Sequence, residues 1–245
     1  MLLREDVWLA ERLGVKCYAL SYNSDAVGEC SVIESQLLVQ KASWENEDLP
    51  CFVYAKILTQ NTNIVEVFQE NGFRVVDTHI QFEHTGESIR GNCDQAINFR
   101  YAKPEDEEDV SDIARKTFRY SRFHLDNMIP NKIADDLKSD WARNFFLNKR
   151  GEHMIIAECK GEIAGFAQLL VRGESLIIDL IAVQKKFQGK RIGFQMLLHI
   201  LDLFSARFSI VVGTQVANIA SLRLYENAGF LITSSSYILH YHYQK

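Results

Sequence analysis

One loop in the sequence combines glycine, positive charge and the start of a helix. Segment 183–193, VQKKFQGKRIG, joins an apolar run to a stretch with helical spacing of apolar residues. Consecutive backbone N–H groups at a helix N-terminus bind pyrophosphate, and Lys190 and Arg191 would add positive charge beside them. The pattern differs from the P-loop and from GxGxxG, and the plain alternative is an ordinary strand-to-helix turn with a basic surface.

Two side chains could take part in proton transfer. The phenol of Tyr225 has an ordinary pKa near 10, so it can protonate a departing thiolate at neutral pH. The alternative for Tyr225 is a core aromatic residue on an amphipathic helix. Asp179 is a lone acid in an apolar run, which makes it either a base, acting directly or through water, or a buried carboxylate held by hydrogen bonds. Glu174 and ordered water are the other candidates for the base.

Apolar spacing predicts the elements that must carry these residues. Pro104 and the four acids that follow it predict a helix start, and a second helix is expected from about Asn131. The pattern then gives strands at 153–158, 163–171 and 176–183, a helix at 192–206, a strand at 208–212, a helix at 218–227 and a strand at 237–243. This order predicts an α/β protein in which one central mixed sheet is flanked by helices.

The chain is expected to have two domains. A polar, glycine-bearing segment at 84–95 separates two regions with apolar patterns. The prediction is a small N-terminal α/β region at 1–90 and a larger domain at 91–245.

An internal similarity links the two regions. TQxxNI is followed by NGF in one copy and by AGF in the other, at 59–64 with 71–73 and at 214–219 with 228–230. The N-terminal region is therefore expected to be a degenerate half-repeat of the second, although so short a match also arises by chance. Four residues before the glycine, the first copy has Phe68 where the second has Tyr225, so only the second is expected to be catalytic.

Composition excludes several classes of protein. Of 245 residues, 47% are hydrophobic and 24% charged, and 27 basic against 32 acidic residues leave a net charge of −5. These values exclude a mainly disordered chain, and an acidic chain without a basic patch is not expected to bind nucleic acid. Five scattered cysteines without CxxC spacing predict reduced thiols and no metal site. The acidic N-terminus and the short apolar runs predict no signal peptide, no membrane span and a cytoplasmic location.

Residues 97–245 resemble the GCN5-related N-acetyltransferase superfamily. The resemblance rests on the loop, the strand before it and the pattern N-x6-Y-x2-AGF that begins at Asn218. The family's phosphate loop reads Arg/Gln-x-x-Gly-x-Gly/Ala; Gln188 and Gly193 match it, but Arg191 stands at the middle glycine. Because a residue with a Cβ resists positive φ, this departure leaves the loop path open.

The resemblance implies acetyl-CoA as a co-substrate, held in the gap between two diverging strands. Its pantetheine arm would pair with the strand before the loop, and backbone N–H groups at 180–183 would polarise the thioester carbonyl. Tyr225 would be the catalytic acid, with Asp179 as the candidate base. The residues expected to bind the cofactor are Ile181, Ala182, Val183, Gln188, Gly189, Lys190, Arg191, Ile192, Gly193 and Asn218.

A second group of motifs is similar to bacterial acetyltransferases that act on TDP-linked amino-deoxy sugars. These motifs are FRYSRFHLD at 118–126, Trp141-x-x-Asn144 and Arg150-Gly151. Arginine binds phosphate bidentately and aromatic rings cover apolar faces, which suits a sugar nucleotide. The residues expected to bind the acceptor are Phe118, Ser121, Arg122, Phe123, His124 and Trp141.

Each of these acceptor residues also has a structural interpretation. Arg122 could form a surface ion pair with Asp126 or another acid, and the aromatic residues could belong to the core. His124 is either a polar group of the pocket or exposed to solvent.

The sequence as a whole predicts an acetyl-CoA-dependent N-acetyltransferase. Its acceptor would be a nucleotide-linked amino-deoxy sugar, and a TDP-4-amino-4,6-dideoxyhexose is expected. The amine would attack acetyl-CoA directly, and the product would be used in the biosynthesis of a surface polysaccharide. Transfer through a cysteine is disfavoured because none lies near the loop or Tyr225. The alternatives are an acetyltransferase for a protein N-terminus or a small amine, and a non-catalytic acyl-CoA sensor. The chain is compatible with a homodimer.

Overall fold

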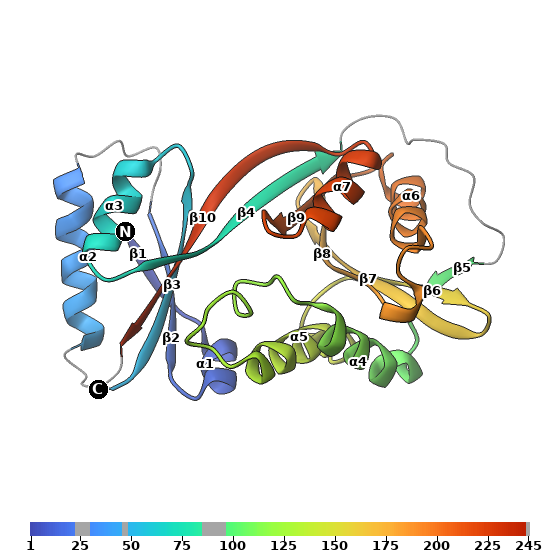
Figure 1. The fold of residues 1–245 in the computed structure, drawn as a ribbon, viewed down its shortest axis with the longest axis horizontal. Coiled ribbons are helices and arrows are strands. Elements are labelled where there is room, and N and C mark those ends of the chain that lie inside the picture. Colours follow the sequence, from blue (N-terminus) through green and yellow to red (C-terminus); the bar gives the residue numbers. More distant parts are fainter. Residues whose placement is uncertain (23–29, 46–48, 85–96, 244–245) are drawn as a thin grey trace. The chain divides into compact units, whose positions relative to one another are not determined.

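The contacts of the chain divide it into two units. The computed structural model describes residues 1–22, 30–45, 49–84 and 97–243. Unit 1 comprises Met1–His79 and Ser235–Lys245, and unit 2 comprises Ile80–Ser234. Two long strands, β4 (Arg74–His84) and β10 (Leu231–Tyr243), contribute residues to both units (Figure 1). No helix in the described part of the chain is long and apolar enough to cross a membrane.

The strands of unit 1 follow the order β1-β2-β3-β10-β4. Its other elements are β1 (Leu2–Glu5), α1 (Val7–Leu13), β2 (Lys16–Ser21), α2 (Cys30–Glu45), β3 (Cys51–Leu58) and α3 (Thr62–Glu70). β2 is parallel to β3, and β3 is antiparallel to β10. Alternate residues of β3, such as Val53 and Ile57, are buried against Trp44 of α2 and Phe68 of α3 in one core.

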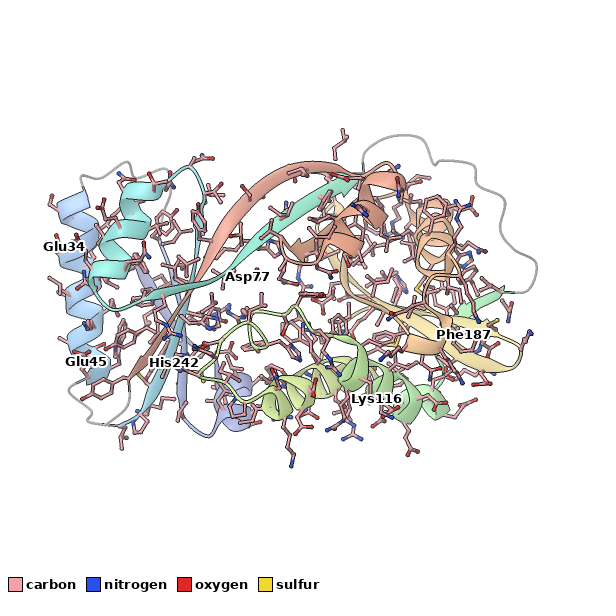
Figure 2. All side chains as sticks on the ribbon, in the orientation of Figure 1. Glu34, Glu45, Asp77, Lys116, Phe187 and His242 are labelled. Atoms are coloured by element: carbon pink, nitrogen blue, oxygen red, sulfur yellow. The ribbon has the colours of Figure 1, made fainter. Side chains whose placement is uncertain are left out.

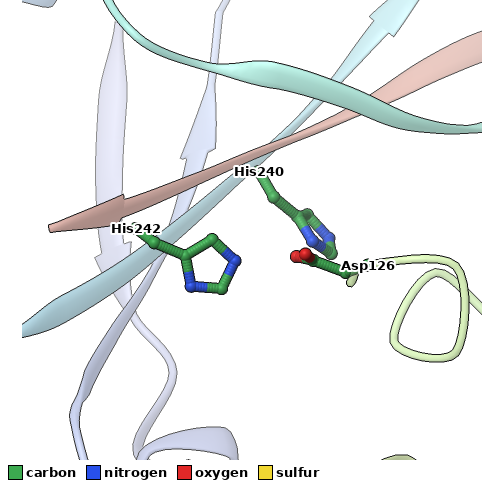
Figure 3. A group of neighbouring side chains, drawn as sticks. All are labelled: Asp126, His240 and His242. Atoms are coloured by element: carbon green, nitrogen blue, oxygen red, sulfur yellow. The ribbon is translucent and has the colours of Figure 1, made fainter. Parts of the chain in front are cut away.

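The opposite face of β10 carries two histidines in unit 1. His240 and His242 lie two residues apart and so project from the same face of the strand (Figure 3). The ring centroid of Phe52 on β3 lies 4.7 Å from that of His240 and 5.0 Å from that of His242. Asp126, also drawn in Figure 3, belongs to unit 2.

The strands of unit 2 follow the order β10-β4-β9-β8-β7-β6-β5. Its other elements are β5 (Ile97–Tyr101), α4 (Glu107–Thr117), α5 (Asn131–Phe146), β6 (His153–Cys159), β7 (Glu162–Arg172), β8 (Ser175–Val183), α6 (Ile192–Phe204), β9 (Ser209–Gln215) and α7 (Ile219–Asn227). Helices α4 and α5 cover one face of the sheet and α6 and α7 the other (Figure 1). A core lies on each face, with Val110 and Ala142 on the first side and Met196 and Phe230 on the second.

The predicted fold class, a central mixed sheet flanked by helices, is confirmed. The helices and strands after residue 104 begin and end within a few residues of the predicted positions, with one exception. β10 begins at Leu231, whereas the prediction placed its start at residue 237. The earlier start was missed because the polar residues at 233–236 interrupt the apolar pattern of the strand. The division of the chain falls at His79 and Ser234, whereas the predicted boundary segment lies almost wholly outside the described residues.

The two copies of the internal similarity have the same local structure. β3, α3 and β4 in one copy and β9, α7 and β10 in the other are each a strand, a helix and a strand. The turn after each helix closes with the same backbone bond, from the N–H of Phe73 to the carbonyl of Phe68 and from the N–H of Phe230 to that of Tyr225, both 3.0 Å. This correspondence supports the half-repeat and places Phe68 at the position of Tyr225.

Candidate active site

The basic loop between β8 and α6 has an ordered path. A 3-10 turn at Lys185–Phe187 buries the ring of Phe187 (Figure 2), and the ammonium groups of Lys186 and Lys190 lie 5.1 and 5.2 Å from its centroid. Gly189 follows with a φ of 76°. Helix α6 then begins at Ile192, and its N-cap residue makes no side-chain capping bond, so the first N–H groups of the helix can serve an anion.

Arg191, the residue that departs from the family pattern, is this N-cap. Its φ of 57° and ψ of 13° lie in the left-handed region, where the family has glycine. For a residue with a Cβ this conformation costs roughly 1–2 kcal/mol. The loop therefore keeps the tight turn despite the substitution. The guanidinium of Arg191 lies 5.0 Å from the ring centroid of Phe194 on the first turn of α6.

The strands β8 and β9 separate before the loop. Their parallel pairing runs from Ser175 and Ser209 to Ile178 and Val212, although β8 continues to Val183. The N–H of Gln184 is directed to β7, where it bonds to the Ala164 carbonyl at 2.8 Å.

Alternate residues of β8 direct their backbone groups to opposite sides. Ala182 therefore faces β7 with its N–H and carbonyl, as Gln184 does, while Ile181 and Val183 face the open side. Gln188 reaches back along this side, since its Nε2 donates to the Val183 carbonyl at 2.9 Å. The predicted cofactor residues of the strand and the loop thus lie together.

Gly165→Ala is expected to destabilise the protein by about 1–3 kcal/mol. Gly165 pairs with Val183, and a Cβ at this position would lie 2.5 Å from the Ala182 carbonyl oxygen. Urea denaturation measures the free energy of unfolding. Gly193→Ala, whose Cβ would meet its nearest neighbour at 3.4 Å, is the matched control and is expected to be nearly neutral. Equal free energies for Gly165→Ala and the wild type would contradict this packing.

A β-bulge places Asp179 at the point where β8 leaves β9. The pairing of β7 with β8 passes from Ile178 to Leu180, so Asp179 is the extra residue of the bulge. Ile178 packs in the core beside α6, whereas Leu180 packs in the core beside α4 and α5. The strand is therefore turned over at Asp179, whose side chain reaches the α5 side.

The carboxylate of Asp179 accepts hydrogen bonds from several side chains. Arg150 binds it bidentately, with Nε 2.6 Å from Oδ2 and Nη2 2.7 Å from Oδ1. The indole Nε1 of Trp141 donates at 2.8 Å, and Nε2 of Gln168 at 3.4 Å. Of the two interpretations of Asp179, the structure shows the hydrogen-bonded carboxylate. The side chain of Asp179 is 10% exposed and that of Arg150 is 35% exposed.

Positive charge gathers around Trp141. The ammonium of Lys138 lies 4.6 Å and the guanidinium of Arg150 4.7 Å from its ring centroid, and Lys138 is also 5.0 Å from that of Phe118. Burial lowers the pKa of Lys138 to about 8, an effect that Asp179 opposes and that Arg122 and Arg150 add to. Asp179 therefore lies beside Arg150, and both of them and Arg122 act on Lys138.

The loop between α4 and α5 carries the other predicted acceptor residues. The guanidinium of Arg122 lies 4.6 Å from the ring centroid of Phe123, which is buried. Ser121 Oγ lies 2.6 Å from Nδ1 of His124, whose Nε2 lies 3.1 Å from Oδ1 of Asp135. The side chain of His124 is 3% exposed, so the imidazole does not lie in solvent. Burial lowers the pKa of His124, and Asp135 opposes this effect. Ser121 and His124 thus tie this loop to Asp135 of α5.

Tyr225 lies in the core beside α6 and α7. It is 2% exposed, and its ring centroid is 5.5 Å from that of Phe82 and 6.0 Å from that of Phe230. Burial raises the pKa of Tyr225 far above its ordinary value, although a hydrogen bond with Ser221 one helical turn earlier opposes this. The hydroxyl is therefore protonated over the whole range in which the protein is handled. Asn218, the N-cap of α7, accepts a bond from the N–H of Ser221 at 3.3 Å.

Comparison with protein families identifies the chain. Residues 108–230, which include the diverging strands, the basic loop and Tyr225, match the acetyltransferase (GNAT) family. The chain belongs to the GNAT family. The resemblance predicted from the sequence is thereby confirmed. In this GNAT chain, the pairing of β8 with β9 ends at Ile178, ahead of the loop.

Similar proteins agree with this assignment. The spore coat polysaccharide biosynthesis protein SpsD of Bacillus subtilis (strain 168) is 35% identical over 140 residues, which are 56% of this chain and 48% of SpsD. The chain therefore matches about half the length of this curated relative. A GCN5-related N-acetyltransferase from Sphaerobacter thermophilus has the same fold at 12% identity, with a TM-score of 0.67 over 93% of this chain and 72% of that one. One from Kribbella flavida gives 10% identity and a TM-score of 0.63, over 92% and 80%.

Some residues of the site do not stand out in the sequence. No sequence pattern indicates a function for Lys138 or Gln168. Arg150 belongs to the Arg150-Gly151 motif, but no function for it follows from the sequence. The spacing of three residues between Lys138 and Trp141 on one helix face is the signal that could have found Lys138. Within either unit taken by itself, the described residues bring together no three metal-binding side chains. The absence of a metal stays a prediction.

Proposed function

We propose that this chain transfers the acetyl group of acetyl-CoA to the amine of a nucleotide-linked amino-deoxy sugar. A TDP-4-amino-4,6-dideoxyhexose is the proposed acceptor, used in the cytoplasm for a surface polysaccharide. The position of Asp179 carries the proposal. It is the first residue of β8 beyond the pairing with β9, and it binds Arg150 and Trp141. Acetyl donor and anionic acceptor can therefore meet at one point of the sheet.

The donor side rests on the separated strand and the helix N-terminus. Backbone groups of Ile181 and Val183 would pair with the pantetheine arm, and the N–H groups at the start of α6 would hold the pyrophosphate. Lys190 and Arg191, both exposed, add charge at the rim of the loop. Membership of the GNAT family supports acetyl-CoA as the donor.

The acceptor side rests on cations next to aromatic rings. Arg122, Lys138 and Arg150 supply charge for a diphosphate, and Trp141 and Phe118 supply flat apolar faces. An acetyltransferase for a cationic peptide would instead need an acidic site. The name of SpsD, a polysaccharide biosynthesis protein, supports a sugar-linked acceptor.

The chain's residues have distinct parts in the proposed reaction. The neutral amine forms a C–N bond to the acetyl carbon while N–H groups of β8 on the open side stabilise the oxyanion. As the C–S bond breaks, Tyr225 donates its phenolic proton to the sulfur, and the proton of the amine leaves to water. Asp179 is proposed as a positioning residue, because both of its carboxylate oxygens already accept hydrogen bonds from Arg150 or Trp141.

Asp179→Asn separates positioning from base catalysis. Loss of the bidentate ion pair is expected to raise the acceptor KM about tenfold with a smaller change in kcat, since a charge-assisted bond contributes about 1.5–3 kcal/mol. Steady-state kinetics with each substrate varied in turn measure this split. A fall of about a hundredfold or more in kcat at unchanged acceptor KM would identify Asp179 as the base and contradict its positioning role.

Thiol release from acetyl-CoA tests the proposed function. The acceptors are TDP- and UDP-linked amino sugars, a short peptide with a free N-terminus and a small polyamine. Saturable turnover with a nucleotide-linked amino sugar is expected. Turnover of the peptide or the polyamine alone would assign the chain to another acceptor class. No turnover of any acceptor, while acetyl-CoA still binds, would favour a non-catalytic sensor.

A further inference from the structure

We propose that Lys138, Arg122 and Arg150 form one cationic subsite for the phosphate groups of the acceptor, and that Lys138 becomes protonated when they bind. This inference rests on the proposed function for the identity of the acceptor, but the binding of a phosphate-bearing ligand can be tested without any turnover.

The geometry of Arg150 leaves one edge of its guanidinium for a ligand. Nε and Nη2 form the edge that binds Asp179, at 2.6 and 2.7 Å. The planar guanidinium has a second edge, formed by Nη1 and Nη2, which points away from this carboxylate. A guanidinium fixed in this way loses little entropy when it binds phosphate. Asp179 therefore orients the guanidinium of Arg150 and leaves its second edge available to a ligand.

Lys138 supplies a compact charge next to this fixed edge. Its ammonium lies over the rings of Trp141 and Phe118, at 4.6 and 5.0 Å, and those rings are apolar neighbours that replace water. Among the described residues, the ammonium of Lys138 makes these ring contacts and no hydrogen bond or ion pair. A half-buried ammonium that lies over aromatic rings is well placed to receive an anionic ligand.

The charges that face Lys138 come from several elements. Arg122 lies on the loop before α5, Arg150 follows α5 and Asp179 lies on β8. His124 belongs to the same loop as Arg122, and the charge of Lys138 helps to lower the pKa of His124. Two arginines and one carboxylate therefore act on the ammonium of Lys138. Burial and these arginines lower the pKa of Lys138 to about 8, so about half of the molecules carry a neutral amine at pH 8.

A bound diphosphate would reverse this balance. Opposite charge within a few ångströms favours the protonated amine, so the pKa of Lys138 rises on binding and the protein takes up protons from the buffer. At pH 8 the uptake is expected to be up to about half a proton for each ligand bound. Because the protonated form binds, affinity is full below pH 8 and declines as the pH rises above it.

Calorimetry with TDP tests the subsite. The protein is first saturated with acetyl-CoA, so that the basic loop is occupied, and TDP is then titrated at pH 8 in buffers that differ in ionisation enthalpy. The wild type is expected to bind TDP and to take up protons. Lys138→Met is expected to bind at least tenfold more weakly and without uptake, whereas Lys138→Arg should bind without uptake because arginine is already charged.

Controls separate charge from folding. Lys132→Met, an exposed lysine of the same helix, should behave like the wild type, and thymidine without phosphate should cause no proton uptake. Unchanged affinity and uptake in Lys138→Met, or no TDP binding by the wild type, would overturn the subsite. TDP binding as described without turnover of any amino sugar would leave the subsite in place and remove the proposed function.

Discussion

Replacing Tyr225 with phenylalanine is expected to lower kcat by about 100-fold to 10,000-fold, the range for loss of a positioned general acid. Without the phenol, the thiolate of CoA must leave unprotonated or take its proton from water. The ring of phenylalanine keeps the contacts with Phe82 and Phe230, so the core and the affinity for acetyl-CoA are expected to remain. Thiol-release kinetics and calorimetry with acetyl-CoA measure the two properties separately.

The pH dependence gives this prediction a second test. Burial raises the pKa of Tyr225 above its ordinary value, and the protonated phenol is the active form. The activity that depends on Tyr225 is therefore present at all pH values below that raised pKa, and kcat should not fall between pH 7 and 10 through its ionisation.

Tyr22→Phe is the matched control for Tyr225→Phe. It removes a hydroxyl of unit 1 that accepts a hydrogen bond from Asn61 at 2.9 Å, and kcat should not change. A Tyr225→Phe variant with wild-type kcat would exclude Tyr225 as the proton donor and return it to the role of a core aromatic residue.

Gly193→Asp is expected to weaken acetyl-CoA binding by at least about 100-fold, which corresponds to about 2.7 kcal/mol. Gly193 is the second residue of α6, beside the N–H groups proposed to hold the pyrophosphate. A carboxylate at this position would compete for those N–H groups and repel the phosphates. The helix itself should not suffer, because an acid in the first turn interacts favourably with the helix dipole.

Gly193→Asn separates charge from bulk in the same calorimetric measurement. A Cβ here makes ordinary contacts with Leu224 at 3.4 Å and Val183 at 3.6 Å, and asparagine has nearly the size of aspartate without its charge. We expect asparagine to weaken binding far less than aspartate. Equal affinities for wild type and Gly193→Asp would show that the pyrophosphate does not bind at this helix.

Local features of the site could be predicted from the sequence, because they depend on neighbouring residues. Glycine and basic residues before an apolar helical pattern gave the loop and α6, which begins at Ile192 as predicted. Arg191 is an exception to this local dependence. Its Cβ made the loop path uncertain, and only the structure shows that it accepts a φ of 57°.

The non-local features could not be predicted in this way. The bulge at Asp179 depends on the register of β7 against β8, which no pattern in either strand specifies. Arg150 and Asp179 form their ion pair across 29 residues of sequence, and Trp141 and Asp179 bond across 38. The sequence indicated that Asp179 needs a partner, but several cations could have filled that place. The share of β10 in unit 1 depends likewise on its pairing with β3.

The ratio of kcat/KM for a TDP-linked amino-deoxy sugar to that for the same amino sugar without its nucleotide tests the central claim most directly. Both acceptors offer the same amine, so they differ only in the diphosphate and base that the cationic subsite and its aromatic rings are proposed to bind. We predict a preference of about 1,000-fold or more for the TDP-linked sugar, about 4 kcal/mol of binding used at the transition state. Equal values for the two acceptors would contradict a nucleotide-sugar acetyltransferase.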